Sequence, residues 1–437
     1  MSHERRNYWA FLLDGGLFVG GVSFVNAQTL LPGVILDEGG PAWLAAFVPS
    51  AMVVGLFSLP VLTARWIDGL RRLKPFVLKV GVMQRVVYLL AGLLLLTPGL
   101  GESGLIWIIA LAPLFSGICG GVGFAGFQRF YISCVPPRMR ASNVAYRFLF
   151  GGSTGVLAGL VIERLIAGLP LAKAMANLHF LAFGWMVLSW IALSTSREPP
   201  SEEDHTADEP EANPPVLPAK FDLFSGLRDL VASGPGRSRR LRFLTAVVFM
   251  HAFFFAVPFF AAYLQRSLGE SKAFLGVLAM WSMGGNAVGN LLAAGVGDRF
   301  GARLPFLLGS LGIAIVMLVV PWVEGRTASC VVYAAFAVCV MLMVVGKDTL
   351  VMDFGPVKRQ ASYLAAMALV TMLSLLGASA IGFVLWELTD TFAVLAYTTA
   401  AGSLLCFWAL KGIPEPRSDV QTSPLVRLRR GLLRYFR

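Results

Sequence analysis

The chain has 437 residues, of which 57% are hydrophobic and only 14% are charged, and its mean hydropathy is +0.71. Soluble domains are roughly 45–50% apolar and about 25% charged, so this composition excludes a soluble enzyme. Lysine and arginine outnumber aspartate and glutamate by 36 to 25, which in a soluble protein would suggest nucleic-acid binding. The basic residues instead lie between long apolar runs, so we expect the lipid bilayer as a partner and no nucleic acid.

Mostly apolar windows of roughly 20 residues, the length at which a helix spans a bilayer, recur along the chain. Six lie before residue 196 and six after residue 240. We therefore predict an all-α polytopic membrane protein with twelve transmembrane helices in two six-helix halves. The approximate spans are 8–33, 42–63, 76–97, 105–134, 143–167, 176–195, 241–265, 273–296, 305–322, 327–355, 363–386 and 391–411.

A polar stretch separates the two sets of apolar windows. Acidic residues run from Glu202 to Glu211 among several prolines, a composition typical of a solvated linker. We predict an N-terminal six-helix half over 1–195, a cytoplasmic linker over 196–240, a C-terminal six-helix half over 241–411 and a basic cytoplasmic tail over 412–437. We do not expect a cleaved signal peptide, because Asp14 interrupts the first apolar run.

Most lysines and arginines lie at the N-terminus, in alternate loops, in the linker and in the tail. Loops on the cytoplasmic side of a membrane accumulate these residues. The distribution predicts a multi-pass protein of the plasma or bacterial inner membrane with both termini in the cytoplasm. We expect it to be a monomer.

One loop sequence occurs in both halves. Residues 68–76 align without gaps with residues 298–306 at an offset of 230. The second copy, Gly-Asp-Arg-Phe-Gly-Ala-Arg over 297–303, resembles the signature loop of the major facilitator superfamily. The first copy departs from that pattern, with Gly69 in place of the arginine and Arg71 in place of the glycine.

The resemblance covers nearly the full length and implies a transporter of two pseudo-symmetric halves. In such a loop an aspartate can face a helix N-terminus, and basic residues can bridge to acids across the halves, which would latch one conformation. The resemblance assigns this role of cytoplasmic gate loops to Asp68, Arg71, Arg72, Asp298, Arg299, Gly301 and Arg303.

Ionisable residues inside the hydrocarbon are costly and usually face a partner or a water-filled cavity. The resemblance implies that helices 1, 4, 7 and 10 line the central cavity. The polar residues of those helices are therefore our substrate and coupling candidates: Asp14, Gln28, Arg129, His251, Lys347 and Asp348. Arg85 and Arg147, in helices 3 and 5, fall outside this set.

Asp14 and Arg129 are expected to form a pair. Each lies roughly 8–11 Å from the cytoplasmic end of its helix, at a rise of about 1.5 Å per residue. Pairing would neutralise two charges that neither helix tolerates alone. Two interpretations stay open: a static structural ion pair, or a site for substrate or proton.

No motif for catalysis, cofactor or metal binding occurs in the sequence. The five cysteines lie in apolar stretches without a Cys-x-x-Cys pair, so we expect no enzyme activity, no cofactor and no metal site. We expect a secondary active transporter that moves a small polar solute by alternating access, with protons as the coupling ion in symport. Two alternatives stay open: an efflux antiporter for amphipathic compounds, and a non-transporting receptor or scaffold with a transporter-like fold.

The topology makes a prediction for cysteine labelling in intact cells. On a background without the native cysteines, Gly39→Cys and Thr389→Cys should react with an impermeant maleimide, whereas Ser201→Cys and Ser423→Cys should react only after permeabilisation. External labelling of Ser201→Cys would contradict the two-half topology.

Overall fold

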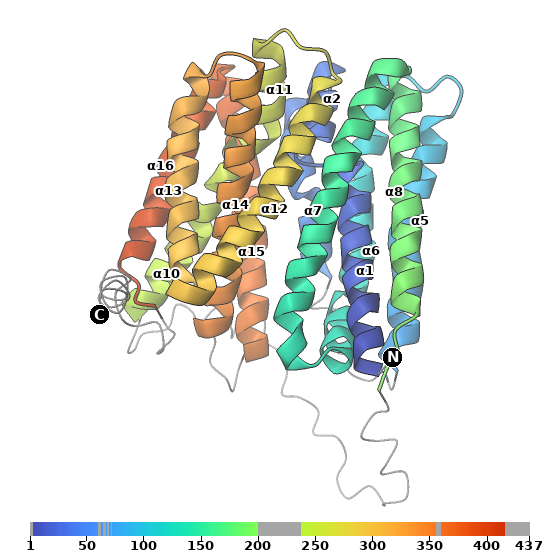
Figure 1. Ribbon diagram of the computed structural model, residues 1–437. Helices are drawn as coiled ribbons and strands as arrows, with labels where there is room; N and C mark the ends of the chain where they lie inside the picture. The colour runs from blue at the N-terminus through green and yellow to red at the C-terminus, as the bar shows by residue number, and fades with distance from the viewer. Residues whose placement is uncertain are drawn as a thin grey trace, which may run out of the picture. The chain divides into compact units, whose positions relative to one another are not determined.

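The structure, a computed structural model, describes residues 3–59, 63, 67, 70, 72–199, 237–354 and 360–415. All regular secondary structure in these residues is helical (Figure 1). The helices are α1 (His3–Ser23), α2 (Leu30–Asp37), α3 (Ala42–Ser58), α5 (Leu73–Leu95), α6 (Glu102–Cys134), α7 (Pro137–Gly168), α8 (Leu171–Ser194), α10 (Arg237–Met250), η2 (His251–Phe255), α11 (Val257–Ser267), α12 (Phe274–Phe300), α13 (Arg303–Val319), η3 (Val320–Trp322), α14 (Arg326–Phe354), α15 (Gln360–Thr389) and α16 (Phe392–Lys411).

The prediction of an all-α polytopic membrane protein is confirmed. Each predicted span coincides with at least one helix, and nine helical stretches of the described residues are long and apolar enough to cross a membrane. Ala42–Ser58 is a shorter apolar helix, so the number twelve itself is not confirmed.

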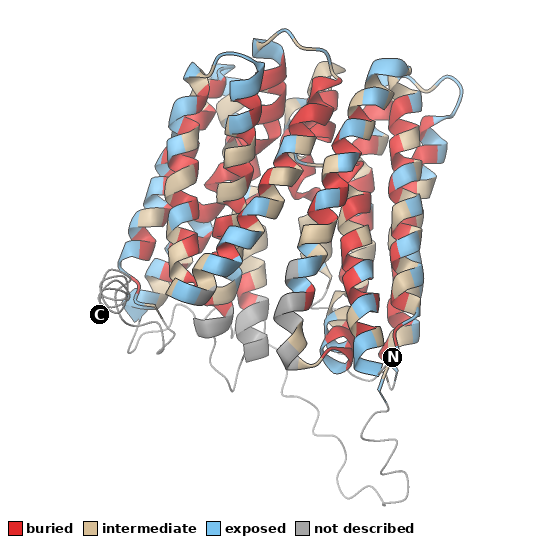
Figure 2. Ribbon diagram, in the orientation of Figure 1, coloured by how far each residue is buried: buried red, intermediate tan, exposed pale blue. Residues whose placement is uncertain are grey.

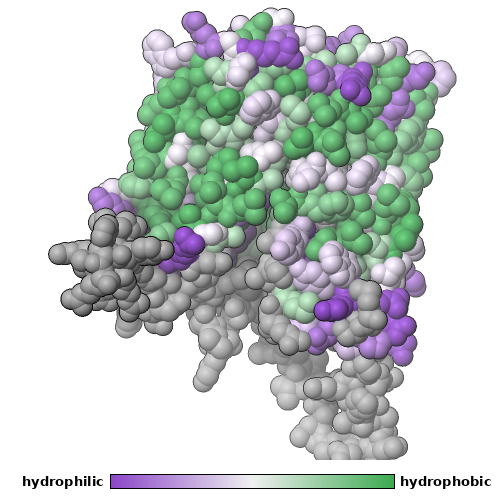
Figure 3. Space-filling model, in the orientation of Figure 1, coloured by the Kyte–Doolittle hydropathy of each residue, from purple (hydrophilic) through white to green (hydrophobic). Residues whose placement is uncertain are grey.

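The outer surface of the helices is apolar. Figure 2 shows buried residues alternating with exposed ones along most of the long helices. Large aliphatic side chains are among the exposed ones, for example Leu93 and Leu94 on α5 and Leu291 on α12. On the face that Figure 3 shows, hydrophobic residues cover the middle of the helices and hydrophilic residues gather toward their ends. Such a surface suits contact with lipid tails.

The chain folds into two compact units. Unit 1 contains residues 1–225 together with 257–280, and unit 2 contains residues 226–256 together with 281–437. Unit 1 therefore includes α11, which comes from the second half of the sequence and packs against α2 and α3. The division into sequence halves at 195 and 241 stays a prediction, because contacts group residues by packing and not by repeat.

Within unit 1, ion pairs join α11 and the segment after it to the end of α2. The Arg266 guanidinium contacts Asp37 Oδ1 at 3.1 Å, and Lys272 pairs with Glu38. The Asp37 side chain is only 8% exposed. These pairs fasten a segment of the second sequence half to the first.

The predicted first span is interrupted. α1 ends at Ser23 and α2 begins at Leu30. Between them, Asn26 Oδ1 accepts the backbone N–H groups of Gln28 and Thr29 at 3.0 and 2.9 Å. An asparagine side chain that bonds the backbone two or three residues ahead stabilises a turn in competition with the helix, which explains the break.

The predicted span 241–265 is interrupted as well. The chain leaves the α-helix at His251, forms the 3₁₀ segment η2 and resumes as α11 at Val257. Pro258 has no N–H to give to the carbonyl four residues earlier and its ring crowds that carbonyl, so a continuous helix is disfavoured here. The interrupted segment packs closely against α16. Thr399 Oγ1 on α16 donates to the Ala252 carbonyl at 3.2 Å, and a Cβ at Gly402 would collide with Ala252 Cβ.

One end of unit 1 is held by reciprocal charge contacts. Glu198, just after α8, accepts the backbone N–H groups of Leu73 and Lys74 at 2.7 and 3.0 Å and so caps the N-terminus of α5. The Lys74 ammonium donates to the carbonyls of Ser194 and Ser196 at the C-terminal end of α8. Each charge faces the helix end of opposite partial charge, which is stabilising.

Unit 2 repeats this arrangement with different residues. Glu415, after α16, accepts the backbone N–H of Arg303 at 3.0 Å, at the start of α13. The Arg303 guanidinium donates to the carbonyls of Leu410 and Lys411 at 3.3 and 2.8 Å. Gly301 adopts a φ of +87° beside Glu415, and a Cβ there would lie 2.3 Å from the Glu415 carboxyl carbon.

The two caps predict a stability effect. Glu198→Ala and Glu415→Ala should each lower the free energy of unfolding by about 1 kcal/mol, since each leaves helix N-terminal N–H groups without an acceptor. Thermal unfolding of the detergent-purified protein measures this. Glu324→Ala, which alters an exposed acid, serves as the control. Equal melting temperatures for all three variants and the wild type would contradict the capping role.

Candidate functional site

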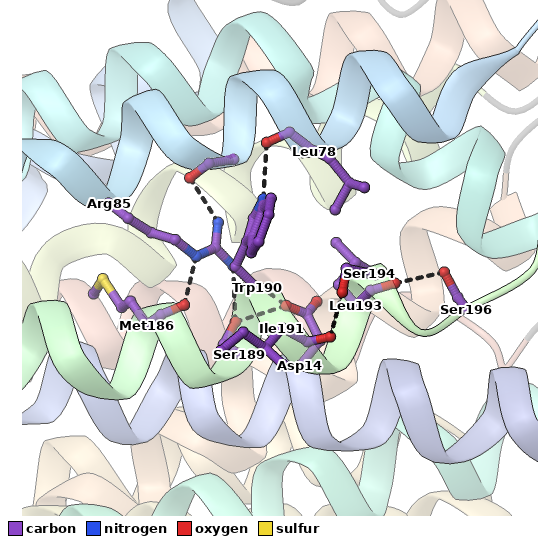
Figure 4. A network of polar contacts seen from close by, with 11 residues as sticks. Asp14, Leu78, Arg85, Met186, Ser189, Trp190, Ile191, Leu193, Ser194 and Ser196 are labelled. Carbon is purple, nitrogen blue, oxygen red and sulfur yellow. Dashed lines mark hydrogen bonds and ion pairs between the residues drawn. The ribbon is translucent and has the colours of Figure 1, made fainter.

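A buried cluster of charged and polar side chains lies inside unit 1 (Figure 4). Asp14 on α1 accepts hydrogen bonds at Oδ1 from Ser189 on α8, at 2.6 Å, and from Arg85 on α5, at 3.3 Å. The side chains of Arg85 and Asp14 are only 7% and 6% exposed. A full ion pair is thus enclosed by three helices of a bundle whose surface is apolar.

Arg85 is fixed by several acceptors at once. Its Nε donates to the Met186 carbonyl at 2.6 Å, and its Nη1 donates to the Gly81 carbonyl at 2.8 Å. Its Nη2 donates to Ser189 Oγ at 2.8 Å as well as to Asp14. Two of these acceptors are backbone carbonyls, which bond the guanidinium independently of Asp14.

A second guanidinium approaches the same carboxylate. Arg147 on α7 lies close enough to Asp14 to interact electrostatically. It packs against the backbone of α1, where a Cβ at Gly15 would lie 1.8 Å from Arg147 Nε. Its Cζ stands over the rings of Phe127 and Tyr131 on α6, 5.9 and 5.7 Å from their centroids.

The predicted pair of Asp14 with Arg129 is wrong, because Arg85 takes that place. Arg129 is exposed and donates to the Ile67 carbonyl at 3.3 Å. Gln28 is also exposed and lies in the break between α1 and α2. Depth along two helices alone was the basis for the pair, and depth does not determine which way a side chain points around its helix.

The candidates of the second half fall in unit 2. Lys347 and Asp348 on α14 pair with each other at 2.5 Å, although neighbouring residues on a helix point about 100° apart. The length of the lysine side chain spans that angle. His251 is buried, its Nδ1 lies 2.8 Å from the Val247 carbonyl, and Lys347 is near enough to act on it electrostatically.

The predicted gate loops are described only in part. Asp68 and Arg71 lie outside the described residues, as does the side chain of Asp298. Arg72 precedes α5 in an extended conformation, and Arg299 is exposed. Arg303 was expected to bridge to the other half. Its described hydrogen bonds instead go to the end of α16 in its own unit.

Arg85, Ser189 and Arg147 are the residues that sequence reasoning left out. Two charged residues in predicted helices 3 and 5 were a usable signal, but the family expectation that helices 1, 4, 7 and 10 line the cavity set them aside. Ser189 gave no signal, because a serine in an apolar helix is common. In the described part of the chain, no three His, Cys, Asp or Glu side chains gather as metal ligands would.

Long helices with apolar surfaces around a buried charge cluster indicate a multi-pass membrane protein. Residues 242–436 match the model of the Major Facilitator Superfamily. No curated protein matches the sequence.

Solved transporter structures match nearly the whole chain. A D-xylose–proton symporter matches with a TM-score of 0.70 at 14% identity, over 95% of this chain and 99% of its own. A bacterial homologue of the human lysosomal transporter Spinster, inward-facing and unoccupied, gives 0.63 at 15% identity, over 97% and 99%. A bacterial homologue of the iron transporter ferroportin, outward-facing, gives 0.59 at 18% identity, over 93% and 98%. The predicted resemblance to major facilitator superfamily transporters is confirmed, and the chain has their fold.

The Asp14–Arg85 pair predicts a double-mutant result. Asp14→Asn should lower the free energy of unfolding by roughly 3–5 kcal/mol, because it leaves a buried guanidinium without its counter-charge. Adding Arg85→Gln should recover much of that loss, since both buried charges are then absent. Thermal unfolding in detergent measures the effect, and Glu102→Gln at an exposed site is the control. Additive losses in the double variant would show that the two charges do not depend on each other.

Proposed function

We propose that the chain is a secondary active transporter that moves a small polar solute by alternating access, coupled to protons in symport through Asp14. It acts as a monomer in the plasma or bacterial inner membrane, with both termini in the cytoplasm. The observation that carries this proposal is the enclosed Asp14 carboxylate, which pairs with Arg85 and interacts electrostatically with Arg147. Burying an ionisable group in a membrane helix costs free energy, so such groups are rare and usually mark substrate or proton pathways.

The two interrupted helices support a solute site. Transporters commonly place their sites where corresponding helices of two repeats are discontinuous, since the break frees backbone groups to bind a ligand. The first helix of each predicted half is interrupted here, at residues 24–29 and 251–256.

The ion pairs at the end of α2 supply a gate for alternating access. Arg266–Asp37 and Lys272–Glu38 join segments from the two sequence halves. In the predicted topology this end faces outward, so opening a path from outside requires both pairs to break. The Arg266 side chain is 47% exposed and that of Asp37 only 8%, so water reaches this pair from the arginine side.

Proton coupling through Asp14 is consistent with the fixed position of Arg85. A proton on Asp14 removes the negative charge without moving Arg85, which its backbone acceptors hold. The electrostatic environment of Arg147 then changes while the helix packing stays the same. This is the kind of change that a coupling residue needs, because it alters solute affinity and not the fold.

The test uses proteoliposomes with a pH-sensitive dye inside and a panel of sugars, nucleosides, amino acids and organic acids outside. We expect one class of solute to drive inward proton movement by the wild type. Asp14→Asn should lose gradient-driven accumulation yet retain exchange of solute, because exchange requires no net proton movement. Glu102→Gln is the matched control.

The outcomes separate the alternatives. Normal accumulation by Asp14→Asn would remove Asp14 from coupling and make His251 or Asp348 the acid to examine. Proton movement driven only by amphipathic cations would favour an efflux antiporter. Specific binding of solutes without any flux would favour a receptor.

A further inference from the structure

One guanidinium in unit 1 has no carboxylate of its own. Arg147 is half-buried between α1, α6 and α7. Among the described residues, none accepts a hydrogen bond from it and none forms an ion pair with it. Asp14, the carboxylate that acts on it electrostatically, gives its Oδ1 to Arg85 and Ser189.

The charges of this cluster do not balance. Arg85 and Asp14 neutralise each other in a direct pair, which leaves the positive charge of Arg147 in excess. A single charge in low-dielectric surroundings is strongly unfavourable unless an opposite charge or water compensates it. The site is therefore electrostatically complementary to an anion.

The surroundings of Arg147 are shaped to hold its guanidinium. Phe127 and Tyr131 present their rings to it, and both rings contact Phe11, with centroids 5.9 and 5.3 Å away. Aromatic faces stabilise a cation without satisfying its N–H donors. Gly15 leaves the space that the guanidinium fills, since a Cβ there would collide with Nε. The donors of Arg147 thus stay available for a ligand.

We propose that Arg147 binds the oxyanion of the transported solute, a carboxylate or phosphate group. This inference rests on the proposed transport function and names its substrate class. A guanidinium offers parallel N–H donors that match the two oxygens of a carboxylate or phosphate. The aromatic rings of Phe127 and Tyr131 give the solute an apolar wall beside its charged group.

Asp14 links this site to protons. The groups that act on Asp14 from the helices around it are Arg85, Arg147 and Ser189. When Asp14 is negative it competes with the anion for the field of Arg147, and when it is protonated the anion meets two positive charges. Proton and anion therefore favour each other's binding by the same factor, which is the requirement for symport.

The first experiment measures binding to purified full-length protein in a neutral detergent, by isothermal titration calorimetry. The probes are inorganic phosphate, D-glucose 6-phosphate and succinate, and the last two are paired with their neutral counterparts, D-glucose and succinamide. At least one anion should bind while its neutral counterpart does not. Arg147→Gln should weaken that binding about tenfold or more, as expected when a charge-assisted pair is lost.

Two further variants guard against misfolding and against non-specific charge effects. Gly15→Ala removes no charge but displaces the Arg147 side chain, so it should weaken anion binding while the protein stays folded, since the clash is with a flexible side chain. Arg164→Gln, on the same helix at an exposed position, should bind the anion as the wild type does. Equal losses in Arg147→Gln and Arg164→Gln would overturn the proposal.

A second measurement separates a solute from a lipid headgroup as the source of the oxyanion. Melting temperatures are compared in nanodiscs of phosphatidylcholine and of phosphatidylglycerol. We expect stabilisation by phosphatidylglycerol, if present, to be the same in the wild type and in Arg147→Gln. Stabilisation that disappears in Arg147→Gln, without binding of any soluble anion, would overturn the solute site.

Binding and transport fail independently. Anion binding that depends on Arg147, together with an absence of flux, would contradict the transport function and leave the binding site standing. Proton-coupled flux of a neutral solute, unaffected by Arg147→Gln, would overturn the anion site and support transport. In the wild type the affinity for the anion should rise as the pH falls, and Asp14→Asn should abolish this dependence. A dependence unchanged in Asp14→Asn would overturn the link to Asp14.

Discussion

A charge inside an apolar bundle must be compensated, and this requirement organises the first unit. Asp14 compensates Arg85 in a direct pair, and backbone carbonyls and Ser189 satisfy the remaining donors of that arginine. Among the described residues, Arg147 receives aromatic faces and the field of Asp14. The cluster thus consists of a rigid part, around Arg85, and a part that a ligand can complete. Glycine at position 15 is essential to this division, because any side chain there would push the second guanidinium away.

The same electrostatic rule acts at the helix ends. Glu198 and Glu415 each cap the start of one helix and follow the end of another, while Lys74 and Arg303 bind the carbonyls that those ending helices leave free. Two helices are joined in this way at their ends. Because the arrangement occurs in both units, each unit secures its own helix ends. The ion pairs of Asp37 and Glu38 are of a different kind, since they join segments from both halves of the sequence.

Composition and spacing predicted most of the fold, because the length of an apolar run is itself the physical requirement for spanning a bilayer. The helix breaks were not predicted, although Asn26 and Pro258 are residues that disfavour a continuous helix. A hydropathy average over a window hides single residues of this kind and shows only the length of the apolar run. The pairing of Asp14 was predicted wrongly for another reason. Side-chain direction depends on how helices rotate against each other, and that depends on close approaches between residues far apart in sequence, such as Gly15 and Arg147.

The two units handle their intramembrane charges differently, and this difference bears on mechanism. In unit 2, Lys347 and Asp348 neutralise each other on one helix, and His251 is held by the carbonyl one turn before it. In unit 1, the described charges leave a positive excess at Arg147. A solute that carries a negative group would therefore gain electrostatic energy from the first unit, where the described charges do not balance, and not from the second, where the lysine and the aspartate already compensate each other.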